Sequence, residues 1–296
     1  MIDVKTGISA DEVRFAGKHV LFVEGKDKAA VDPKVLRDLV GNTITIQPLG
    51  PSYYVKSVAQ ALSEYHPTYY FLIDRDHHDD QAVESCWANF PDPNTHNLLI
   101  WRKREIENYF LDPTFLFHSK FVCVSQQLLN DTILQDATRR LFLEVTNAVI
   151  VSIREEFKRS WIVAFTNPDD FSTFDRALSK LRATTEFEEF RNTVTATVAD
   201  AEIVNRFNLF YAEMTGGKQK LEFGSGNWLE RMQGKKILGQ VVNSNCFQVR
   251  DSRNIQLVGR EKLNEVVKDL LQKDDANLPT DFTQLKRLID QRIKAS

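Results

Sequence analysis

Glycine and proline are distributed along this chain of 296 residues in a way that restricts the structure of its middle third. All twelve glycines lie within 7–50 or 216–259, and Pro168 is the only proline between residues 114 and 215. Apolar residues in that stretch recur every three or four positions. A segment of about a hundred residues with this spacing and almost no turn formers is typical of helices. We therefore expect 115–215 to form an all-helical arm.

The first 114 residues show a different pattern, in which short apolar runs alternate with amphipathic stretches. The apolar runs predict strands near 19–23, 43–47, 69–73 and 97–101, and the amphipathic stretches predict helices near 29–40, 52–65 and 80–88. Strands separated by helices indicate an α/β domain with a mostly parallel sheet flanked by helices. Ligands of such sheets bind at the carboxyl ends of the strands. We therefore expect the ligand site of the 1–114 domain at that edge of the sheet.

Glycines return after residue 215, in a segment that is locally basic. Residues 216–262 contain nine Lys or Arg against four Asp or Glu. Amphipathic helices near 263–271 and 282–293 then close the chain, so we expect 216–296 to complete the fold. The local excess of positive charge predicts phosphate contacts, with an ordinary charged surface as the alternative. The candidate nucleic-acid-binding residues of this segment are Lys218, Lys220 and Lys236.

Net charge, cysteine content and the lack of long apolar runs limit how this chain can bind a polyanion and where in the cell it can work. The formal net charge is −3, so a site for a polyanion has to be a local basic surface. The three cysteines are far apart and form no CxxC pair, which argues against a disulfide framework and fits a reducing cytoplasm. The first residues lack the apolar core of a signal peptide, and no apolar run approaches the ~20 residues that span a bilayer. We expect a cytoplasmic protein without a membrane segment.

Three acidic residues follow two of the predicted strands. Glu24 comes directly after the run HVLFV and precedes Gly25, which allows a sharp turn. Asp74 and Asp76 follow the run YYFLI, and residues two apart in an extended segment point the same way. Carboxylates gathered from adjacent strand ends are the oxygen ligands that Mg²⁺ or Mn²⁺ prefers. The pattern predicts a metal site, whereas each acid alone would be an ordinary solvated turn residue.

The sequences around these acids resemble the TOPRIM family, whose fold is shared by topoisomerases, bacterial primases and OLD-family nucleases. The segments FVEGKD at 22–27 and LIDRD at 72–76 are similar to its two signatures. The segment WRKREIENYFLDP at 101–113 is similar to a third block of the OLD-like branch. Chain length, the helical arm and the segment GNWLERMQGKK further resemble the stand-alone TOPRIM effectors of PARIS anti-phage systems. The resemblance implies a TOPRIM-type fold and a nuclease that depends on Mg²⁺ or Mn²⁺.

The same resemblance assigns roles to individual residues. It implies that Glu24, Asp74 and Asp76 hold the metal and that Glu107 is a further ligand or orienting group. Many TOPRIM nucleases carry a second acid four residues after the glutamate, where this chain has Lys28. One firmly held cation, with a second that substrate phosphate helps to bind, therefore fits this sequence better than a complete two-metal site.

Two basic residues are candidates for binding the scissile phosphate. A cation in that position stabilises negative charge on the phosphate or on the leaving oxygen during cleavage. Lys235 in the segment QGKK is the first candidate and Lys26 the second, with a solvated surface lysine as the alternative for both. Arg102 and Arg104 belong to a second basic cluster beside the proposed metal and are further candidates for contacts with nucleic acid.

The resemblance also implies a biological setting. Effectors of this kind are held by an ABC-type ATPase sensor subunit and, once released, act as toxic nucleases with host tRNA as the implied substrate. The chain has no GxxxxGK[ST] loop, so an ATPase has to be a separate subunit. The helical arm is too long for a simple connection and predicts an assembly surface, either for that partner or for a homodimer. The alternatives are a DNA nuclease or nickase and a non-catalytic scaffold that regulates its partner.

Overall fold

The computed structural model describes residues 19–25, 31–92, 97–159, 167, 169 and 172–295, and the chain divides into two compact units. Unit 1 consists of Met1–Ala137 and Leu229–Ser296, and unit 2 consists of Thr138–Trp228. The boundaries differ from those expected at 115 and 215 because the first segments of the expected arm pack into unit 1, where the rings of Phe110 and Phe115 lie 5.8 Å apart. Within the described ranges, no helix combines the length and the apolar character needed to cross a membrane.

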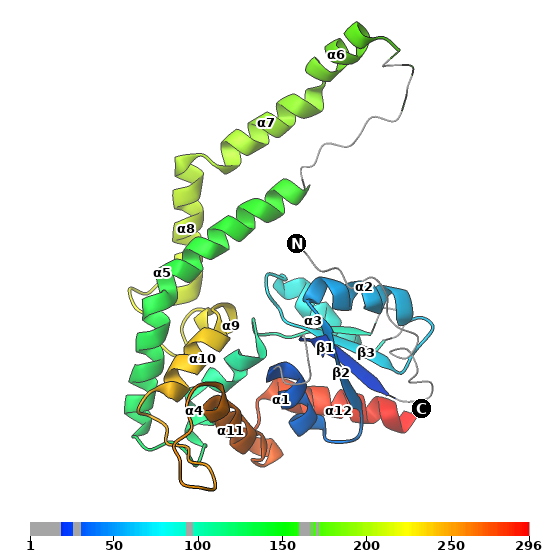
Figure 1. Cartoon of the computed structure of the whole chain (residues 1–296). Coiled ribbons are helices and arrows are strands. Elements are labelled where there is room, and N and C mark those ends of the chain that lie inside the picture. Colours follow the sequence, from blue (N-terminus) through cyan, green and yellow to red (C-terminus); the bar gives the residue numbers. More distant parts are fainter. Residues whose placement is uncertain are drawn as a thin grey trace. The chain divides into compact units, whose positions relative to one another are not determined.

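Unit 1 is built on a four-stranded sheet in which all neighbouring strands are parallel (Figure 1). The strands lie in the order β2-β1-β3-β4 and are β1 (Val20–Glu24), β2 (Thr45–Gly50), β3 (Tyr69–Ile73) and β4 (Leu98–Ile100). The two central strands are almost entirely buried because helices cover both faces of the sheet. The predicted α/β class and the parallel sheet flanked by helices are confirmed.

Helices cover both faces of this sheet. α2 (Ser52–Leu62) and α3 (Asp80–Asn89) lie on one face, and α1 (Val31–Val40) and α12 (Thr280–Ala295) lie on the other (Figure 1). Each helix turns an apolar side inward, as α1 does with Leu36, which is fully buried. Parallel strands connected in this way all have their carboxyl ends at the same edge of the sheet.

The rest of unit 1 comes from two distant parts of the chain. The 3-10 helix η2 (Ile106–Leu111) and α4 (Pro113–Phe117) follow β4. After unit 2 the chain returns with α9 (Trp228–Arg231), α10 (Gly234–Asn243), α11 (Gly259–Leu271) and η4 (Asp275–Asn277). An aromatic cluster joins the early and late segments, since the ring of Phe282 lies 4.9 Å from that of Tyr109 and 5.7 Å from that of Trp101.

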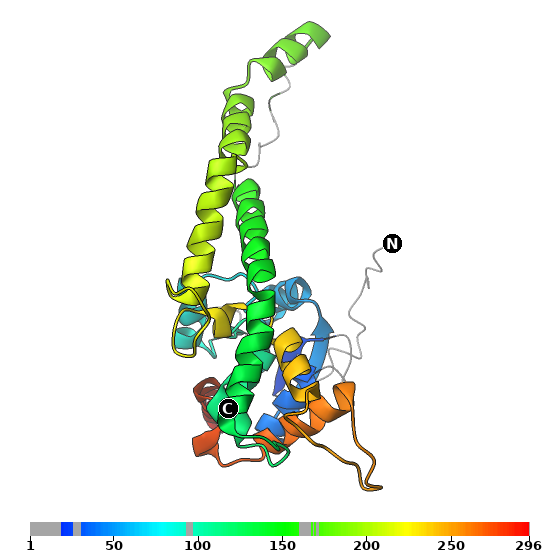
Figure 2. The ribbon, with the colours of Figure 1, turned by 90° about the vertical axis from the view of Figure 1, so that its left-hand side faces the viewer.

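Every described element of unit 2 is a helix. These elements are the later part of α5 (Gln126–Arg159), α6 (Phe174–Arg182), α7 (Thr185–Thr197) and α8 (Asp200–Thr215). α8 runs beside α5 (Figure 2), and Arg206 donates hydrogen bonds to Glu156 at 2.5 Å and to Ser152 at 3.2 Å. Most described residues of the predicted arm are helical, but 118–125 are not helical and include a bridge from Val122 to Phe247, and Pro168 lies outside the described residues.

Candidate metal and phosphate site

Four carboxylates from separate segments meet near the carboxyl edge of the sheet. They come from the end of β1, the first turn of α1, the residue after β3, and η2, and they are Glu24, Asp32, Asp74 and Glu107. β1 and β3 are hydrogen-bonded neighbours, so their parallel pairing places Glu24 beside Asp74. The fold thus brings together three of the predicted acids and adds Asp32.

Glu24 is held by backbone groups from two elements. Its Oε1 accepts a hydrogen bond from the Asp74 N–H at 3.0 Å, and the Ser52 N–H at the start of α2 is a second donor. The next residue, Gly25, has a φ of 134° and exchanges hydrogen bonds of 2.9 and 3.0 Å with Gly50. Residues with side chains rarely adopt this φ, so glycine permits the turn that leaves the Glu24 carboxylate at the strand end.

Burial changes the protonation of Glu24 and Asp32. Desolvation raises the pKa of Glu24 to about 7, the backbone donor of Asp74 opposes the shift, and the charge of Asp76 adds to it. Desolvation likewise raises the pKa of Asp32 to about 7, and the neighbouring charge of Glu24 adds to the shift. The charge of Glu24 thus disfavours ionisation of Asp32, and a bound cation would offset this repulsion.

Glu107 and Asp74 are subject to the same two effects. Glu107 is only 3% exposed, and burial raises its pKa to about 8, with Asp32 and Glu105 as further causes. The pKa of Asp74 is raised well above its ordinary value, first by burial and then by the charges of Asp32 and Glu24. The cluster is therefore held together by the fold against its own electrostatic repulsion.

Asp76 is placed differently from Asp74. It is exposed and has a φ of 44°, so the chain is not extended there and the expected alternation of an extended segment does not apply. Arg75, between the two acids, is buried, donates to the Arg102 carbonyl at 2.6 Å and pairs with Asp80. The anchored arginine and the left-handed turn leave the Asp76 carboxylate in solvent, where its charge still acts on Glu24.

Asp32 is the carboxylate that the sequence interpretation missed. The donor set was expected to lack an acid because Lys28 occupies the position where many TOPRIM nucleases have one. An acidic residue in the first turn of a helix is ordinarily explained by the helix dipole, so its residue type alone gave no indication of a site. The available signal was its place in the first helix after Glu24.

The start of α10 fits closely against η2. Asn108 donates hydrogen bonds of 2.8 and 2.9 Å to two carbonyls of α9 and the residue after it. A Cβ atom on Gly234 would lie 2.3 Å from Asn108 Oδ1, so no larger residue fits there without displacing the contact. The following residue, Lys235, donates its N–H to Glu105 Oε2 at 2.8 Å. This fit explains why the segment QGKK carries a glycine before its lysines.

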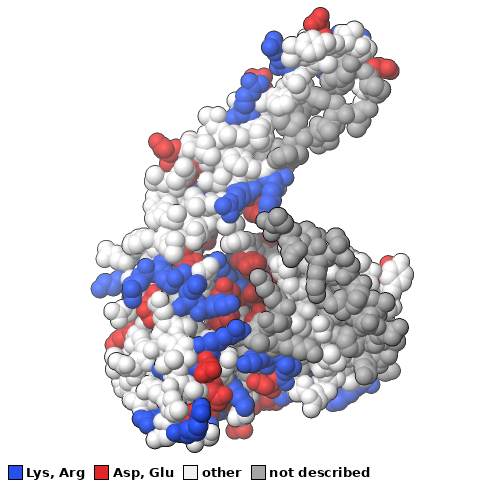
Figure 3. Space-filling view, viewed as in Figure 1, with Lys and Arg blue, Asp and Glu red and all other residues white. Residues whose placement is uncertain are grey.

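Two lysines from different elements flank the carboxylates. Lys235, at the start of α10, is exposed, and its charge opposes the upward shift in the pKa of Asp32. Lys56, on α2, opposes the upward shift in the pKa of Glu24, and its Nζ lies 2.6 Å from His78 Nε2. Burial, and then Lys56, lower the pKa of His78, so a neutral imidazole accepts the hydrogen bond of the ammonium. Figure 3 shows acidic side chains of unit 1 bordered by Lys and Arg side chains.

Lys235 was predicted for this position and Lys56 was not. Lys56 lies one turn inside an amphipathic helix, where a lysine is usually part of a solvated face. Only the packing of α2 against β1 and β3 brings its ammonium to the strand ends. His78, the partner of Lys56, is half-buried.

The predicted arginine contacts have partners within the protein. Arg102 donates to Glu84 at 2.7 Å and to Asp281 at 2.8 Å, so its guanidinium joins α3 to α12. Arg104 donates to a backbone carbonyl of α9 at 3.0 Å. Lys26 lies outside the described residues.

Residues of the basic segment 216–262 belong to both units. The boundary between the units divides it, so Lys218 and Lys220 belong to unit 2 and Lys236 belongs to unit 1, where it is exposed. Lys262 is 3% exposed and is therefore not a surface contact for phosphate. Counting charges along the sequence did not reveal this division, since it depends on which residues pack into which unit.

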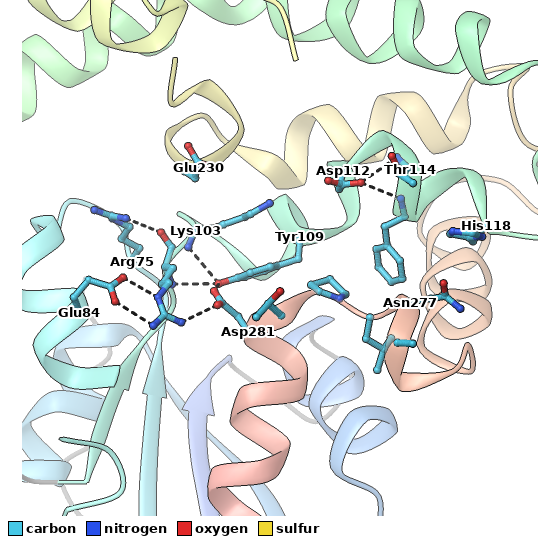
Figure 4. A pocket seen from close by; sticks show the side chains of 16 residues that line it. Arg75, Glu84, Lys103, Tyr109, Asp112, Thr114, His118, Glu230, Asn277 and Asp281 are labelled. Atoms are coloured by element: carbon cyan, nitrogen blue, oxygen red, sulfur yellow. Dashed lines mark hydrogen bonds and ion pairs between the residues drawn. The ribbon is translucent and has the colours of Figure 1, made fainter. Parts of the chain in front are cut away.

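A cavity of about 650 Å³ lies beside η2, α4 and the start of α12 (Figure 4). Charged side chains that line it form hydrogen bonds and ion pairs with one another. Arg102 bridges Glu84 and Asp281, and the Tyr109 hydroxyl donates to Asp281 at 2.5 Å. None of the four clustered carboxylates lines this cavity. We therefore assign the candidate functional site to the carboxylate cluster.

The donor set of the cluster fits a hard divalent cation in its chemistry, since it offers carboxylate oxygens from four segments and a repulsion that a cation would offset. Among the described side chains, no three His, Cys, Asp or Glu residues are arranged to hold a metal ion as they stand. Ligation would therefore require the carboxylates to rotate about their side-chain bonds. No protein-family model matches this chain, and no curated protein or solved structure is significantly similar to it.

Proposed function

We propose that this chain is a nuclease of the TOPRIM type that cleaves phosphodiester bonds with the help of Mg²⁺ or Mn²⁺. The observation that carries the proposal is the group of carboxylates at the carboxyl ends of β1 and β3, where Glu24 and Asp74 are half-buried beside the buried Glu107. Burial of mutually repelling acids is costly for a fold, and a site that binds a cation is a functional reason to retain it. The TOPRIM-like signatures around Glu24 and Asp74 support the same reading.

In this proposal the carboxylates would bind the cation and the lysines would bind the phosphate. Glu24, Asp32, Asp74 and Glu107 would hold the cation, with the exposed Asp76 as an additional oxygen donor. When bound, such a cation activates water and neutralises charge that develops on the phosphate. Lys235 and Lys56 lie on two flanks of the cluster, and their ammonium groups would bind non-bridging phosphate oxygens and keep the scissile bond next to the carboxylates.

The substrate and setting of this nuclease are proposed from the sequence resemblance. We propose RNA, with host tRNA as the favoured substrate, and an ABC-type ATPase subunit that holds the chain inactive until an anti-phage response begins. The support for this setting is the resemblance to stand-alone TOPRIM effectors. A DNA nuclease or nickase would use the same carboxylates and lysines, so the substrate has to be decided by experiment.

The test is incubation of the purified chain with Mg²⁺ and matched pools of tRNA, single-stranded DNA and plasmid. We expect cleavage of tRNA that EDTA abolishes and that Glu24→Gln and Asp74→Asn reduce by at least a hundredfold, on the order expected when a group that stabilises the transition state is lost. Glu64→Gln, which alters an exposed acid at the end of α2, is the matched control and should keep full activity.

Other outcomes select the alternatives. Cleavage of plasmid alone, with the same dependence on Glu24, would assign a DNA nuclease. Absence of cleavage together with absence of Mg²⁺ binding by calorimetry would overturn the metal site and leave a scaffold role. Calorimetry should show that Asp32→Asn weakens Mg²⁺ binding, because Asp32 is one of the four clustered carboxylates.

A further inference from the structure

Two of the three cysteines face each other across a short antiparallel contact in unit 1. Val122 and Phe247 form an antiparallel bridge, so the next residues, Cys123 and Cys246, are directly opposite. The Cys123 N–H donates to the Cys246 carbonyl at 2.9 Å. Directly opposite residues of antiparallel strands have Cβ atoms about 4.5–5.5 Å apart, on the same side, which is close to the separation of about 3.5–4.5 Å in a disulfide.

A buried lysine lies beside this pair, and none of the carboxylates that the structure describes forms an ion pair with it. Lys262, on α11, is 3% exposed, and its ammonium donates to the Ser244 carbonyl at 3.1 Å. Its pKa is lowered by burial, and the groups that oppose this shift are Cys123 and Cys246. Lysine is seldom fully buried unless a negative group pairs with it. Among the described residues, the groups whose negative charge would act on Lys262 are the two cysteines.

We propose that Cys123 and Cys246 are a site of oxidative modification, which closes to an intrachain disulfide in the presence of a peroxide. The thiolate is the reactive form of cysteine, and a nearby cation favours it. Cys123 is exposed and can meet the oxidant, whereas Cys246 is buried next to it. In the reduced protein the Cys123 thiol contacts the Asn245 carbonyl at 3.2 Å, so closure requires rotation of its side chain.

The reaction proceeds in two balanced steps. The Cys123 sulfur attacks one peroxide oxygen, which breaks the O–O bond, gives a sulfenic acid and, with hydrogen peroxide, releases water. The Cys246 sulfur then attacks the Cys123 sulfur, forms the S–S bond and releases a second water. Two thiols are oxidised and one peroxide is reduced. The bond would join the segment before α5 to the end of α10, the helix whose first turn carries Lys235.

The experiment treats the full chain with hydrogen peroxide, alkylates the remaining thiols after unfolding and measures the intact mass. We expect one alkylated cysteine instead of three, a loss of two hydrogen masses, and a peptide that links Cys123 to Cys246. Cys86, on α3, is the internal control, because burial raises the pKa of its thiol. Cys86→Ser should leave the reaction unchanged and Cys123→Ser should abolish it.

The contribution of Lys262 is measured with two variants. Lys262→Met should slow disulfide formation by about tenfold, since it removes the positive charge beside the two sulfurs, and Lys262→Arg should keep the rate within a factor of about two. Retention of three alkylated cysteines, a disulfide that includes Cys86, or dimers linked between chains would overturn the proposal. Equal rates in the Met and Arg variants would overturn the role of Lys262.

Discussion

At the level of single residues, the clustered carboxyl groups tie the stability of the protein to pH. Glu24 and Asp32 have a pKa of about 7 and Glu107 has one of about 8 in the folded protein, all above their ordinary values near 4. A carboxyl group whose pKa is raised by folding binds more protons in the native state than in the unfolded chain. Its contribution to stability is complete below pH 4 and is lost as pH rises through about 7 to 8.

We therefore expect the metal-free protein to melt at a lower temperature at pH 8 than at pH 5.5, by roughly 2–4 °C for each kcal/mol lost. Mg²⁺ should restore more stability at pH 8, because it binds the ionised carboxylates of the native state. Scanning fluorimetry with EDTA or Mg²⁺ measures both effects. Asp74→Asn should reduce both, and a melting temperature that rises between pH 5.5 and pH 8 in EDTA would contradict the assignment.

Lys56 offers a second test at this level. Lys56→Met removes the ammonium next to Glu24 and keeps most of the side chain's length. We expect cleavage to fall on the order of a hundredfold while Mg²⁺ affinity stays within a few-fold, because the residue is proposed to bind phosphate and not metal. Lys34→Met, on an exposed position of α1, is the control. An unchanged cleavage rate in Lys56→Met would limit the phosphate contact to Lys235.

At the level of secondary structure, the close contact between η2 and α10 should be sensitive to substitution. Gly234→Ala would place a methyl group 2.3 Å from Asn108 Oδ1, and we expect a loss of about 1–3 kcal/mol in the free energy of unfolding, measured with urea. Gly239→Ala is a matched control on the same helix, where a Cβ has nothing within 4 Å. It should stabilise the protein by up to about 1 kcal/mol, since alanine favours helix. Equal losses in both variants would contradict the steric account.

The strands and their helices were predictable because their signals are local. The run at 69–73 is apolar throughout, as a strand buried on both faces requires, and the structure places β3 over the same residues. Glu24 and Asp74 were found for the same reason, since each directly follows such a strand. Asp32 and Lys56 were not found, because they reach the site only through the packing of α1 and α2. The left-handed backbone conformation at Asp76 could not be predicted, because no glycine stands at that position to indicate it.

At the level of the whole molecule, unit 2 interrupts unit 1 in sequence, so the candidate site draws on residues from both sides of the interruption. The basic segment 216–262 spans the boundary between the units, so its residues are shared between them. Lys218 belongs to unit 2, whereas Lys235 reaches the carboxylates from unit 1. A count of charges along the sequence combines residues of both units, because only tertiary packing defines the boundary between them.

The prediction that the helical unit supplies an assembly surface can be tested on its exposed apolar side chains. Leu143 and Val204 are 52% and 57% exposed, and such side chains on helices are suited to contacts with another protein molecule. We expect the double substitution Leu143→Glu and Val204→Glu to lower the assembled mass in light scattering or to weaken binding to an ATPase subunit. The control is Glu202→Gln, on the same helix as Val204. Wild-type mass and partner binding in the double variant would refute the prediction.

The fit of Gly234 against Asn108 has a consequence for how related proteins can diverge. The amide of Asn108 needs the space that a missing side chain leaves, so neither residue can change freely while the other stays. Replacement of Gly234 first would weaken the contact that positions Lys235. Replacement of Asn108 by a smaller residue first would remove two hydrogen bonds but make room for a side chain at position 234. We expect these two positions to be inherited as a pair, so that a homologue with a larger residue in place of Gly234 also has a residue smaller than asparagine in place of Asn108.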